Sequence, residues 1–417
     1  MNILTQLQFI PRAHSPNKMS HAEGIEKSNK EVITKIIEGL KQNGDEVRCE
    51  FSKQNVNIMS NIYYICVKFK RKTNGQSEKL SVLLKRPIQI EEIREMVHND
   101  FQFHNEILFY RMYAQPNDNF ARCFYIDERP PTDSVIVLEN VNERGYYSCP
   151  RTYHVPLEYT LAAMREMGRF HGKGYAMKVL QREKFFAIVK QLQEARFDTA
   201  YPFKDYIDII ATRTVEYLRE RDYDAAFCDK MEATFSQAFT EVMMKTVEPL
   251  EPLSTLCHGD FTANNVLFKT EENGQCRAIL IDFAFIRYST PVVDLSTYIC
   301  LSCSDDMMRE KFFEIIRAYH DALKDYLLEA GIWDAEKYSY EALLDDYRRG
   351  ALFGFIIATY FLPVLMGYET AGFETLTNVS YDERAHRSKQ LGGDDMSKIL
   401  ADMLLCLKEL GCLKQYF

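Results

Sequence analysis

The 417-residue sequence predicts an α+β protein with two lobes, a small β-rich N-terminal lobe and a large helical C-terminal lobe. Strand-like composition is concentrated in the first third of the chain, whereas helical patterns dominate the rest. One short island of strands and turns, residues 253–285, interrupts the helical part. This order differs from that of a sandwich, a barrel or a repeated βαβ unit, and it is the order expected of a bilobal protein-kinase-like fold.

The N-terminal elements follow in order along the chain. Apolar residues at helical spacing predict helices over residues 29–41 and 90–113. Runs of strand-forming residues between polar turns predict four strands: residues 61–70, 79–85, 120–127 and 134–138. Helical composition resumes over residues 157–248. We expect three segments: a loosely ordered lead-in (1–28), a nucleotide-binding lobe ending in a hinge (29–141) and a helical lobe carrying the catalytic loop and acceptor pocket (142–417).

Composition and charge narrow the class of protein. The chain has 51 basic and 60 acidic residues and a net charge of -9, so we expect no nucleic-acid partner, which would require a basic face. The eleven cysteines are scattered and odd in number, which favours a reducing compartment over a disulfide framework. The N-terminus lacks the features of a signal peptide, so we expect a cytoplasmic protein. Oligomeric state is left open.

One apolar run, ALFGFIIATYFLPVLMG over residues 351–367, requires a choice between a buried helix and a membrane span. The run is short for a span, Pro363 breaks it, and Thr359 and Tyr360 add polar atoms. We therefore expect a core helix and no membrane span.

The chemistry is concentrated in the segment LCHGDFTANNVLF, residues 256–268, which holds His258, Asp260 and Asn265. Phosphoryl transfer needs a carboxylate beside the acceptor hydroxyl and oxygen ligands that hold Mg²⁺ against the phosphates. An aspartate and an asparagine five residues apart supply both in a kinase catalytic loop. The sequence therefore predicts Asp260 as the catalytic base.

A predicted hairpin follows this loop. Asn273 and Gly274 form a favourable two-residue turn between the strand VLFK and the return strand AILIDF, which ends near Asp282. Because a hairpin brings its two ends together, Asn265 and Asp282 are expected to meet as two Mg²⁺ ligands. The predicted cofactors are therefore ATP and Mg²⁺.

Upstream residues supply the expected nucleotide contacts. Lys85 ends a predicted strand and Glu106 lies on a predicted helix, as in the ion pair that aligns ATP in kinases. The strand VIVLENV leads into a hinge at Glu139 and Val141, where main-chain groups would hold adenine. No glycine stands between residues 55 and 63, so Ser60 is expected to bind phosphate in place of a glycine-rich loop.

The sequence resembles the ecdysteroid kinase-like family, relatives of choline kinase and the aminoglycoside phosphotransferases. The resemblance covers roughly residues 30–412. It rests on these stretches: LCHGDFTANNVLF, AILIDFAFIRYSTPVVDLSTY, FHNEILFY, VIVLENV and GRFHGKGYA.

The resemblance implies Asp260 as base, Asn265 and Asp282 as metal ligands, and Lys85 as the phosphate lysine with Glu106 as its partner. It also implies that His258 and Asp294 brace the catalytic loop, and that His171 is structural. Three positions depart from the family pattern, with Thr262 for Trp, Ala284 for Gln, and Ser289-Thr290 for Gly-Ser. Ala284 is expected to affect the acceptor pocket.

The sequence thus predicts an ATP-dependent small-molecule kinase. The resemblance implies a lipophilic acceptor with a hydroxyl group, such as an ecdysteroid-like steroid or a hydroxylated xenobiotic. Two alternatives stay open: a choline- or amino-sugar-type kinase, and a pseudokinase that binds a ligand without turnover.

Overall fold

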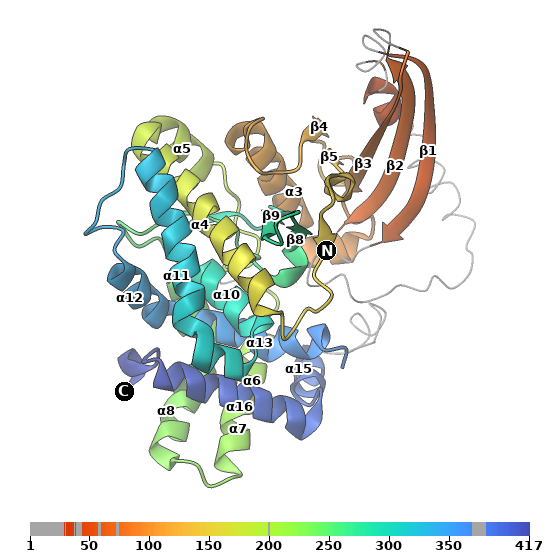
Figure 1. The fold of residues 1–417 in the computed structure, drawn as a ribbon. Coiled ribbons are helices and arrows are strands. Elements are labelled where there is room, and N and C mark those ends of the chain that lie inside the picture. The colour runs from red at the N-terminus through yellow and green to blue at the C-terminus, as the bar shows by residue number, and fades with distance from the viewer. Residues whose placement is uncertain are drawn as a thin grey trace.

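The computed structural model describes residues 29–38 except 30 and 37, then 44–56, 60–71, 75–198, 201–368 and 381–417. A strand-rich N-terminal lobe stands beside a larger helical lobe (Figure 1). The predicted fold class is confirmed. The predicted lead-in, residues 1–28, lies outside the described residues, and the lobe boundary at residue 141 stays a prediction.

The N-terminal lobe is a five-stranded antiparallel sheet in the order β1-β2-β3-β5-β4. Its strands are β1 (Gly44–Val56), β2 (Asn61–Arg71), β3 (Ser77–Arg86), β4 (Cys123–Asp127) and β5 (Val135–Glu139). Helical residues 31–36 pack on the sheet, where Val32 and Ile33 share an apolar core with Ile65 and Val82. Between β3 and β4 lie α2 (Glu91–Met96), α3 (Asn99–Leu108) and the π-helix η2 (Phe109–Tyr113).

Two features of this lobe differ from the sequence prediction. Strand β1 was not among the predicted strands, although apolar and polar residues alternate from Val47 to Ser52. The single helix expected over residues 90–113 is broken at His98, which has a left-handed φ of 50°. The side chain of Gln102 stabilises the break by donating a hydrogen bond to the Val97 carbonyl oxygen at 2.6 Å.

The helical lobe contains two small sheets within a set of packed helices. Its elements up to the catalytic segment are η3 (Val141–Arg144), β6 (Tyr147–Ser148), α4 (Leu157–Leu180), α5 (Arg182–Val189), α6 (Lys204–Ala211), α7 (Arg213–Arg219), α8 (Ala225–Phe235), η4 (Ala238–Met244) and α9 (Lys245–Val247). The catalytic segment contains β7 (Thr255–Cys257), η5 (Ala263–Asn265), β8 (Val266–Thr270), β9 (Cys276–Leu280) and β10 (Arg287–Ser289). The strands form the sheets β6-β8-β9 and β10-β7.

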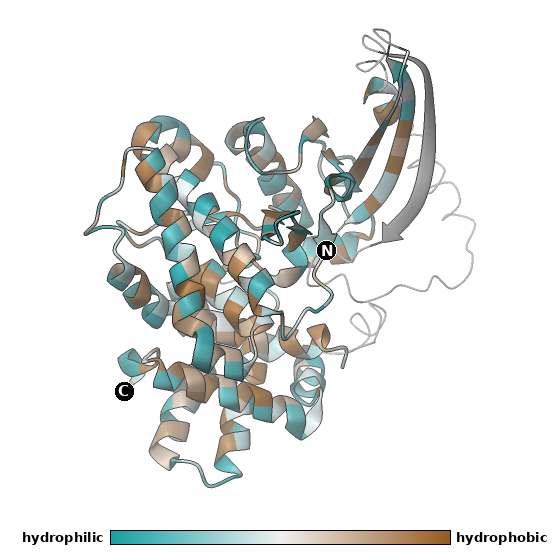
Figure 2. Cartoon of the chain, viewed as in Figure 1, coloured by the Kyte–Doolittle hydropathy of each residue, from teal (hydrophilic) through white to brown (hydrophobic). Residues whose placement is uncertain are grey.

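The remaining helices complete the lobe around one continuous apolar core. They are α10 (Val292–Ser302), α11 (Asp305–Glu329), α12 (Tyr340–Gly350), α13 (Leu352–Leu365), α15 (Tyr381–Lys389), α16 (Gly393–Glu409) and η6 (Lys414–Tyr416). Figure 2 shows the hydrophobic residues gathered where these helices meet and hydrophilic residues on their outer surfaces. Helix α4 packs on α11 and on β7, so it contacts the segment that holds the predicted catalytic residues.

The apolar run at residues 351–367 forms α13, which is buried among the other helices, as expected for a core helix. A Cβ at Gly354 would lie 2.2 Å from the carbonyl oxygen of Ser296, so α13 and α10 approach backbone to backbone. Among the described residues, no single helix is long and apolar enough to cross a membrane. The bent pair α12 and α13, which meet at 51°, passes that test only when both helices are taken together.

Candidate active site

The catalytic segment leaves β7 and turns into the short helix η5, which places Asp260 and Asn265 side by side. Asn265 Nδ2 donates hydrogen bonds to Asp260 Oδ2 at 2.8 Å and to the Asp260 carbonyl oxygen at 2.9 Å. Both residues are buried, with Asp260 2% exposed. The asparagine therefore holds the carboxylate in one orientation from within the same loop.

The β8–β9 hairpin then returns the chain to this point. Its strands pair from Val266 with Leu280 to Thr270 with Cys276. Beyond the strand, the backbone N–H of Ile281 donates to the Asn265 carbonyl oxygen at 3.0 Å. Asp282, the next residue, is therefore brought to the same end of the hairpin as Asn265. The Asn273-Gly274 turn predicted this arrangement.

Asp282 has a left-handed φ of 68°, which is uncommon for a residue other than glycine. Backbone strain of this kind persists where the surroundings impose it, and it is concentrated at functional sites. Here the conformation directs the carboxylate to Lys85, whose Nζ lies 3.2 Å from Asp282 Oδ1.

The donor set fits a magnesium ion. Asn265 Oδ1 is buried and has no hydrogen-bond partner among the described residues, while the amide nitrogen of the same side chain donates to Asp260. An unpaired buried oxygen carries a free-energy penalty that a cation would relieve. Amide and carboxylate oxygens are the ligands that Mg²⁺ prefers, so Asn265 and Asp282 are the residues that would hold it.

Lys85 joins the two lobes electrostatically. Its Nζ lies 2.6 Å from Glu106 Oε2 on α3 as well as against Asp282. Burial lowers the pKa of Lys85, but the Asp282 and Glu106 carboxylates offset burial and hold the pKa above its usual value. For Asp282 burial raises the pKa, but nearby positive charge, chiefly the Lys85 ammonium, brings it below its usual value. Burial dominates at Glu106 and leaves its pKa raised.

The two predicted hinge residues, Glu139 and Val141, differ in their surroundings. The backbone N–H of Glu139 donates to the Arg122 carbonyl oxygen at 2.8 Å, so the sheet already uses it. The carboxylate of Glu139 accepts from the backbone N–H of Arg122 at 3.1 Å. Val141 is buried at the start of η3, and its role as a hinge residue stays a prediction.

Ser60 is buried beside the β1–β2 connection. Asn61, the next residue, pairs with Arg86 in the sheet, so this connection lies at the same end of the sheet as Lys85. Ser60 is thus at the end of the sheet where β3 carries Lys85. Residues 57–59 of the expected phosphate-binding segment lie outside the described residues.

His258 connects the two halves of the site. Its Nε2 lies 3.0 Å from the Ile281 carbonyl oxygen, which can only accept, so Nε2 carries the proton. Its Nδ1 then accepts from the backbone N–H of Asp260 at 3.3 Å. The imidazole therefore holds the backbone of Asp260 against the residue that precedes Asp282.

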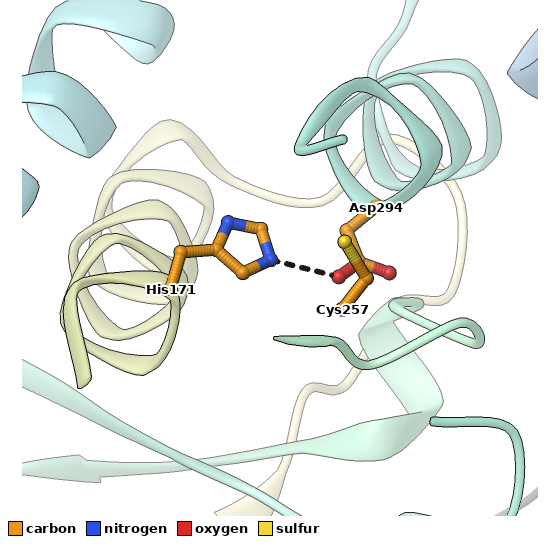
Figure 3. Close-up of side chains that lie close together, drawn as sticks. All are labelled: His171, Cys257 and Asp294. Carbon is orange, nitrogen blue, oxygen red and sulfur yellow. Dashed lines mark hydrogen bonds and ion pairs between the residues drawn. The ribbon is translucent and has the colours of Figure 1, made fainter. Parts of the chain in front are cut away.

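Asp294, on α10, fastens the loop from the other side. Its carboxylate accepts from the backbone N–H of His258 at 2.7 Å and of Gly259 at 2.8 Å. His171 Nε2 on α4 adds a third donor at 3.0 Å (Figure 3). Burial raises the pKa of Asp294, but hydrogen bonding to His171 is the main effect that brings it below its usual value.

His171, Cys257 and Asp294 also have the composition of a metal site, and within the described part of the chain they are the only group of three such residues close enough to share an ion. The Asp294 oxygens are already taken by three N–H donors. The thiol of Cys257 lies 3.3 Å from the Ser289 carbonyl oxygen. The cluster is therefore a bracing network.

Gly259 is required between His258 and Asp260. Its φ is +76°, and an added Cβ would lie 1.9 Å from the Phe285 carbonyl oxygen. Only glycine combines this conformation with such a close approach. The catalytic loop is thereby packed directly onto the segment that follows Asp282.

Replacing Asp294 with alanine is expected to destabilise the protein by about 3–5 kcal/mol, because three buried donors would lose their acceptor. Denaturant unfolding followed by circular dichroism measures the change. Asp345→Ala is the matched control, since Asp345 is 75% exposed and its ion pair within the described part of the chain is with the surface residue Arg348. The control should change stability by less than about 0.5 kcal/mol. Equal stability of the two variants would contradict the bracing role.

Sequence reasoning missed Arg196, whose Nη2 lies 3.2 Å from Asp260 Oδ1. It also missed Asn105, which ties α3 to the chain near Arg196 through Gln193. Arg196 stands in no motif, and Asn105 lies within FHNEILFY, where the pattern drew attention to Glu106 instead. Ala284, expected to affect the acceptor pocket, is 5% exposed and belongs to an apolar cluster with Ile88.

The bilobal fold, the Lys85–Glu106 ion pair and the Asp260–Asn265–Asp282 arrangement define the class of protein: a small-molecule kinase. A family comparison identifies the particular group. The sequence model of the ecdysteroid kinase-like family matches residues 54–332. The chain therefore belongs to that family. The predicted resemblance is therefore confirmed. No curated protein matches the chain.

Several solved structures of aminoglycoside phosphotransferases align with the chain at low identity. The GDP complex of wild-type aminoglycoside 2'-phosphotransferase-IIIa is 14% identical with a TM-score of 0.37, over 89% of this chain and 99% of that one. The complex of APH(2")-IIIa with GDP and kanamycin is 13% identical with a TM-score of 0.34, over 83% and 94%. A mutant of APH(4)-Ia with ADP and hygromycin B is 13% identical with a TM-score of 0.27, over 75% and 94%.

Proposed function

We propose that this protein transfers the γ-phosphoryl group of ATP to a hydroxyl group of a lipophilic small molecule, an ecdysteroid-like steroid or a hydroxylated xenobiotic. One observation carries the proposal. Asn265 holds the Asp260 carboxylate with its amide nitrogen and leaves its amide oxygen unpaired at the end of the hairpin that delivers Asp282. A base and a metal-binding oxygen set are thus joined by one side chain.

In the proposed reaction, Asp260 orients the acceptor hydroxyl and receives its proton. The acceptor oxygen forms a bond to the γ-phosphorus, and the bond from that phosphorus to the bridging oxygen breaks, leaving its electron pair on ADP. Lys85, kept protonated between Glu106 and Asp282, contributes positive charge toward the phosphates. Mg²⁺, when bound, would neutralise charge on the phosphate oxygens.

Phe197, the residue that follows Arg196, lies in a group of aromatic side chains. The rings of Phe197 and Phe353 lie 5.5 Å apart, and Tyr201 stacks on Phe239 at 5.8 Å. Tyr360 belongs to the same region, because its phenol, whose pKa burial raises, also experiences the Asp260 charge. Phe239 and Phe353 are 0% and 1% exposed, so these two rings belong to the core, and the choice of a lipophilic acceptor rests on the family resemblance.

Two other functions are compatible with the fold. A choline- or amino-sugar-type kinase would use the same transfer chemistry on a cationic acceptor. The guanidinium of Arg196 lies against Asp260, which disfavours a cation at that point. A ligand-binding pseudokinase would not need the residues of the transfer chemistry, and all of them are present in this chain.

A substrate screen tests the proposal. We expect purified protein with Mg²⁺ and ATP to add one phosphate to at least one hydroxylated steroid or phenol, as detected by mass spectrometry. GTP is run in parallel, since main-chain groups at the hinge would select the base. Products from choline or amino sugars alone would establish the first alternative. Nucleotide binding without any product across the panel would support the pseudokinase.

A further inference from the structure

Arg196, which no motif marks, lies directly against the proposed base. Its Nη2 is 3.2 Å from Asp260 Oδ1, and its Nη1 is 3.4 Å from the Gly259 carbonyl oxygen. The Arg196 side chain is 16% exposed, whereas the Asp260 side chain is 2% exposed. The other carboxylate oxygen is held by Asn265, so the cation and the proposed metal ligand occupy different oxygens of the same base.

The guanidinium is held in a defined orientation. Its central carbon lies 3.4 Å from the ring centroid of Phe285, so it stacks on the segment that follows Asp282. The backbone N–H of Arg196 donates to Glu194 Oε1 at 2.8 Å. Such fixed placement is what a group needs in order to stabilise charge without reorganising during a reaction.

The segment that carries Arg196, residues 190–198, is also anchored to the N-terminal lobe. Asn105 on α3 donates to the Gln193 carbonyl oxygen at 2.8 Å and accepts from the Gln193 backbone N–H at 2.9 Å. Asn105 is adjacent to Glu106, the partner of Lys85. The positions of the two cations are therefore linked through one helix.

Charge requirements suggest what Arg196 does. The phosphoryl group in flight spreads negative charge over three equatorial oxygens. Lys85 is already shared between Glu106 and Asp282. Among the described residues, Arg196 is the cation that forms an ion pair with Asp260. In the proposed reaction, the acceptor oxygen and the phosphorus meet beside Asp260.

We propose that Arg196 is a further catalytic residue, whose guanidinium binds the oxygens of the transferred phosphoryl group as it passes to the acceptor. This inference rests on the proposed function. A carboxylate offers about four lone-pair positions, so Asp260 can hold Arg196 and Asn265 and still accept the hydroxyl proton. Arg196 keeps its proton and charge throughout, and the bonds made and broken are those of the transfer described above.

The test measures binding to a transition-state analogue, which needs no acceptor. Calorimetry compares the Kd of Mg²⁺·ADP with that of Mg²⁺·ADP plus fluoroaluminate, which mimics the phosphoryl group in flight. We expect wild-type protein to bind the analogue about 100-fold or more tightly than ADP. Arg196→Ala and Arg196→Gln should lose most of that gain with the Kd of Mg²⁺·ADP unchanged, and Arg196→Lys should retain part of it.

Arg287→Ala is the matched control. Arg287 pairs with Glu194, and its guanidinium carbon lies 4.5 Å from the ring centroid of Phe197, so it anchors the same 190–198 segment through other partners than Asp260. This variant should keep the gain for the analogue. Added methylguanidinium should restore the gain in Arg196→Ala, which a merely loosened segment would not allow.

The outcomes separate the two proposals. Failure of wild-type protein to bind Mg²⁺·ADP would overturn the proposed kinase function and with it the role of Arg196. Binding of Mg²⁺·ADP without any gain for the analogue, or an equal gain in wild type and Arg196→Ala, would overturn the role of Arg196 alone. An equal loss in Arg287→Ala would assign the effect to the 190–198 segment and reject the guanidinium contact.

Discussion

Replacing Asp260 with alanine is expected to reduce phosphoryl transfer by about 10²–10⁴-fold with the fold retained. Without the carboxylate, the acceptor hydroxyl loses both its orienting group and the base that takes its proton. The KM for ATP should change little, because Asp260 lies with Asn265 and Arg196 and not with the Lys85 ion pairs. Initial rates at saturating nucleotide, with a product identified in the substrate screen, measure both constants.

Two companion variants sharpen this test. Asp260→Asn keeps the shape of the side chain and removes its charge, so it should lose activity to a similar extent. Asp345→Ala, at a surface position, should keep the wild-type rate. Wild-type turnover in Asp260→Ala would refute the mechanism, while retained ligand affinity and biological effect in that variant would favour the pseudokinase.

Replacing Asp282 with alanine is expected to reduce the rate on the order of 10³-fold, because a metal ligand is worth several kcal/mol of transition-state stabilisation. Lys85 would keep Glu106 as its partner within the N-terminal lobe and would lose its ion pair with the helical lobe. Other contacts between the lobes, such as the hydrogen bonds of Asn105 with Gln193, do not involve Asp282. The distinguishing measurement is a Mg²⁺ titration of the residual rate. Asp282→Ala should need a higher Mg²⁺ concentration for half-maximal activity than wild type does.

The matched variant for this prediction is Asp282→Asn, which retains one oxygen ligand and should fall between wild type and Asp282→Ala. Asp260→Ala serves as the internal contrast, because its loss of rate should leave the Mg²⁺ requirement close to that of wild type. An unchanged Mg²⁺ requirement in Asp282→Ala would exclude Asp282 as a ligand.

Local contacts explain how much of the site could be predicted. Asp260 and Asn265 are five residues apart in one loop, and a hairpin with a recognisable turn brings Asp282 to them. Lys85 and Glu106 are 21 residues apart, on a strand and the helix region that follows it. Such short separations leave few alternative arrangements, so motif spacing was sufficient.

Strand β1 and the helix break at His98, the two features of the N-terminal lobe that were not predicted, have different causes. Strand β1 carries the alternation of a strand, but its charged residues make that pattern weak beside the more apolar runs of β2 and β3. No glycine or proline near His98 indicates the helix break. It depends on side chains such as Gln102 that satisfy the freed backbone groups, and their contacts exist only in the folded lobe.

The sequence by itself determined the α+β architecture, the catalytic loop, the returning hairpin and the family, because each depends on local pattern or on residue types at short spacing. The family resemblance implied that His258 and Asp294 brace the loop, but the tertiary structure alone decided which distant side chains contact Asp294 and the base. Arg196 is 64 residues from Asp260, and His171 is 123 residues from Asp294. Contacts over such separations arise only when helices pack around the loop, and no periodicity or motif encodes which side chains will then meet.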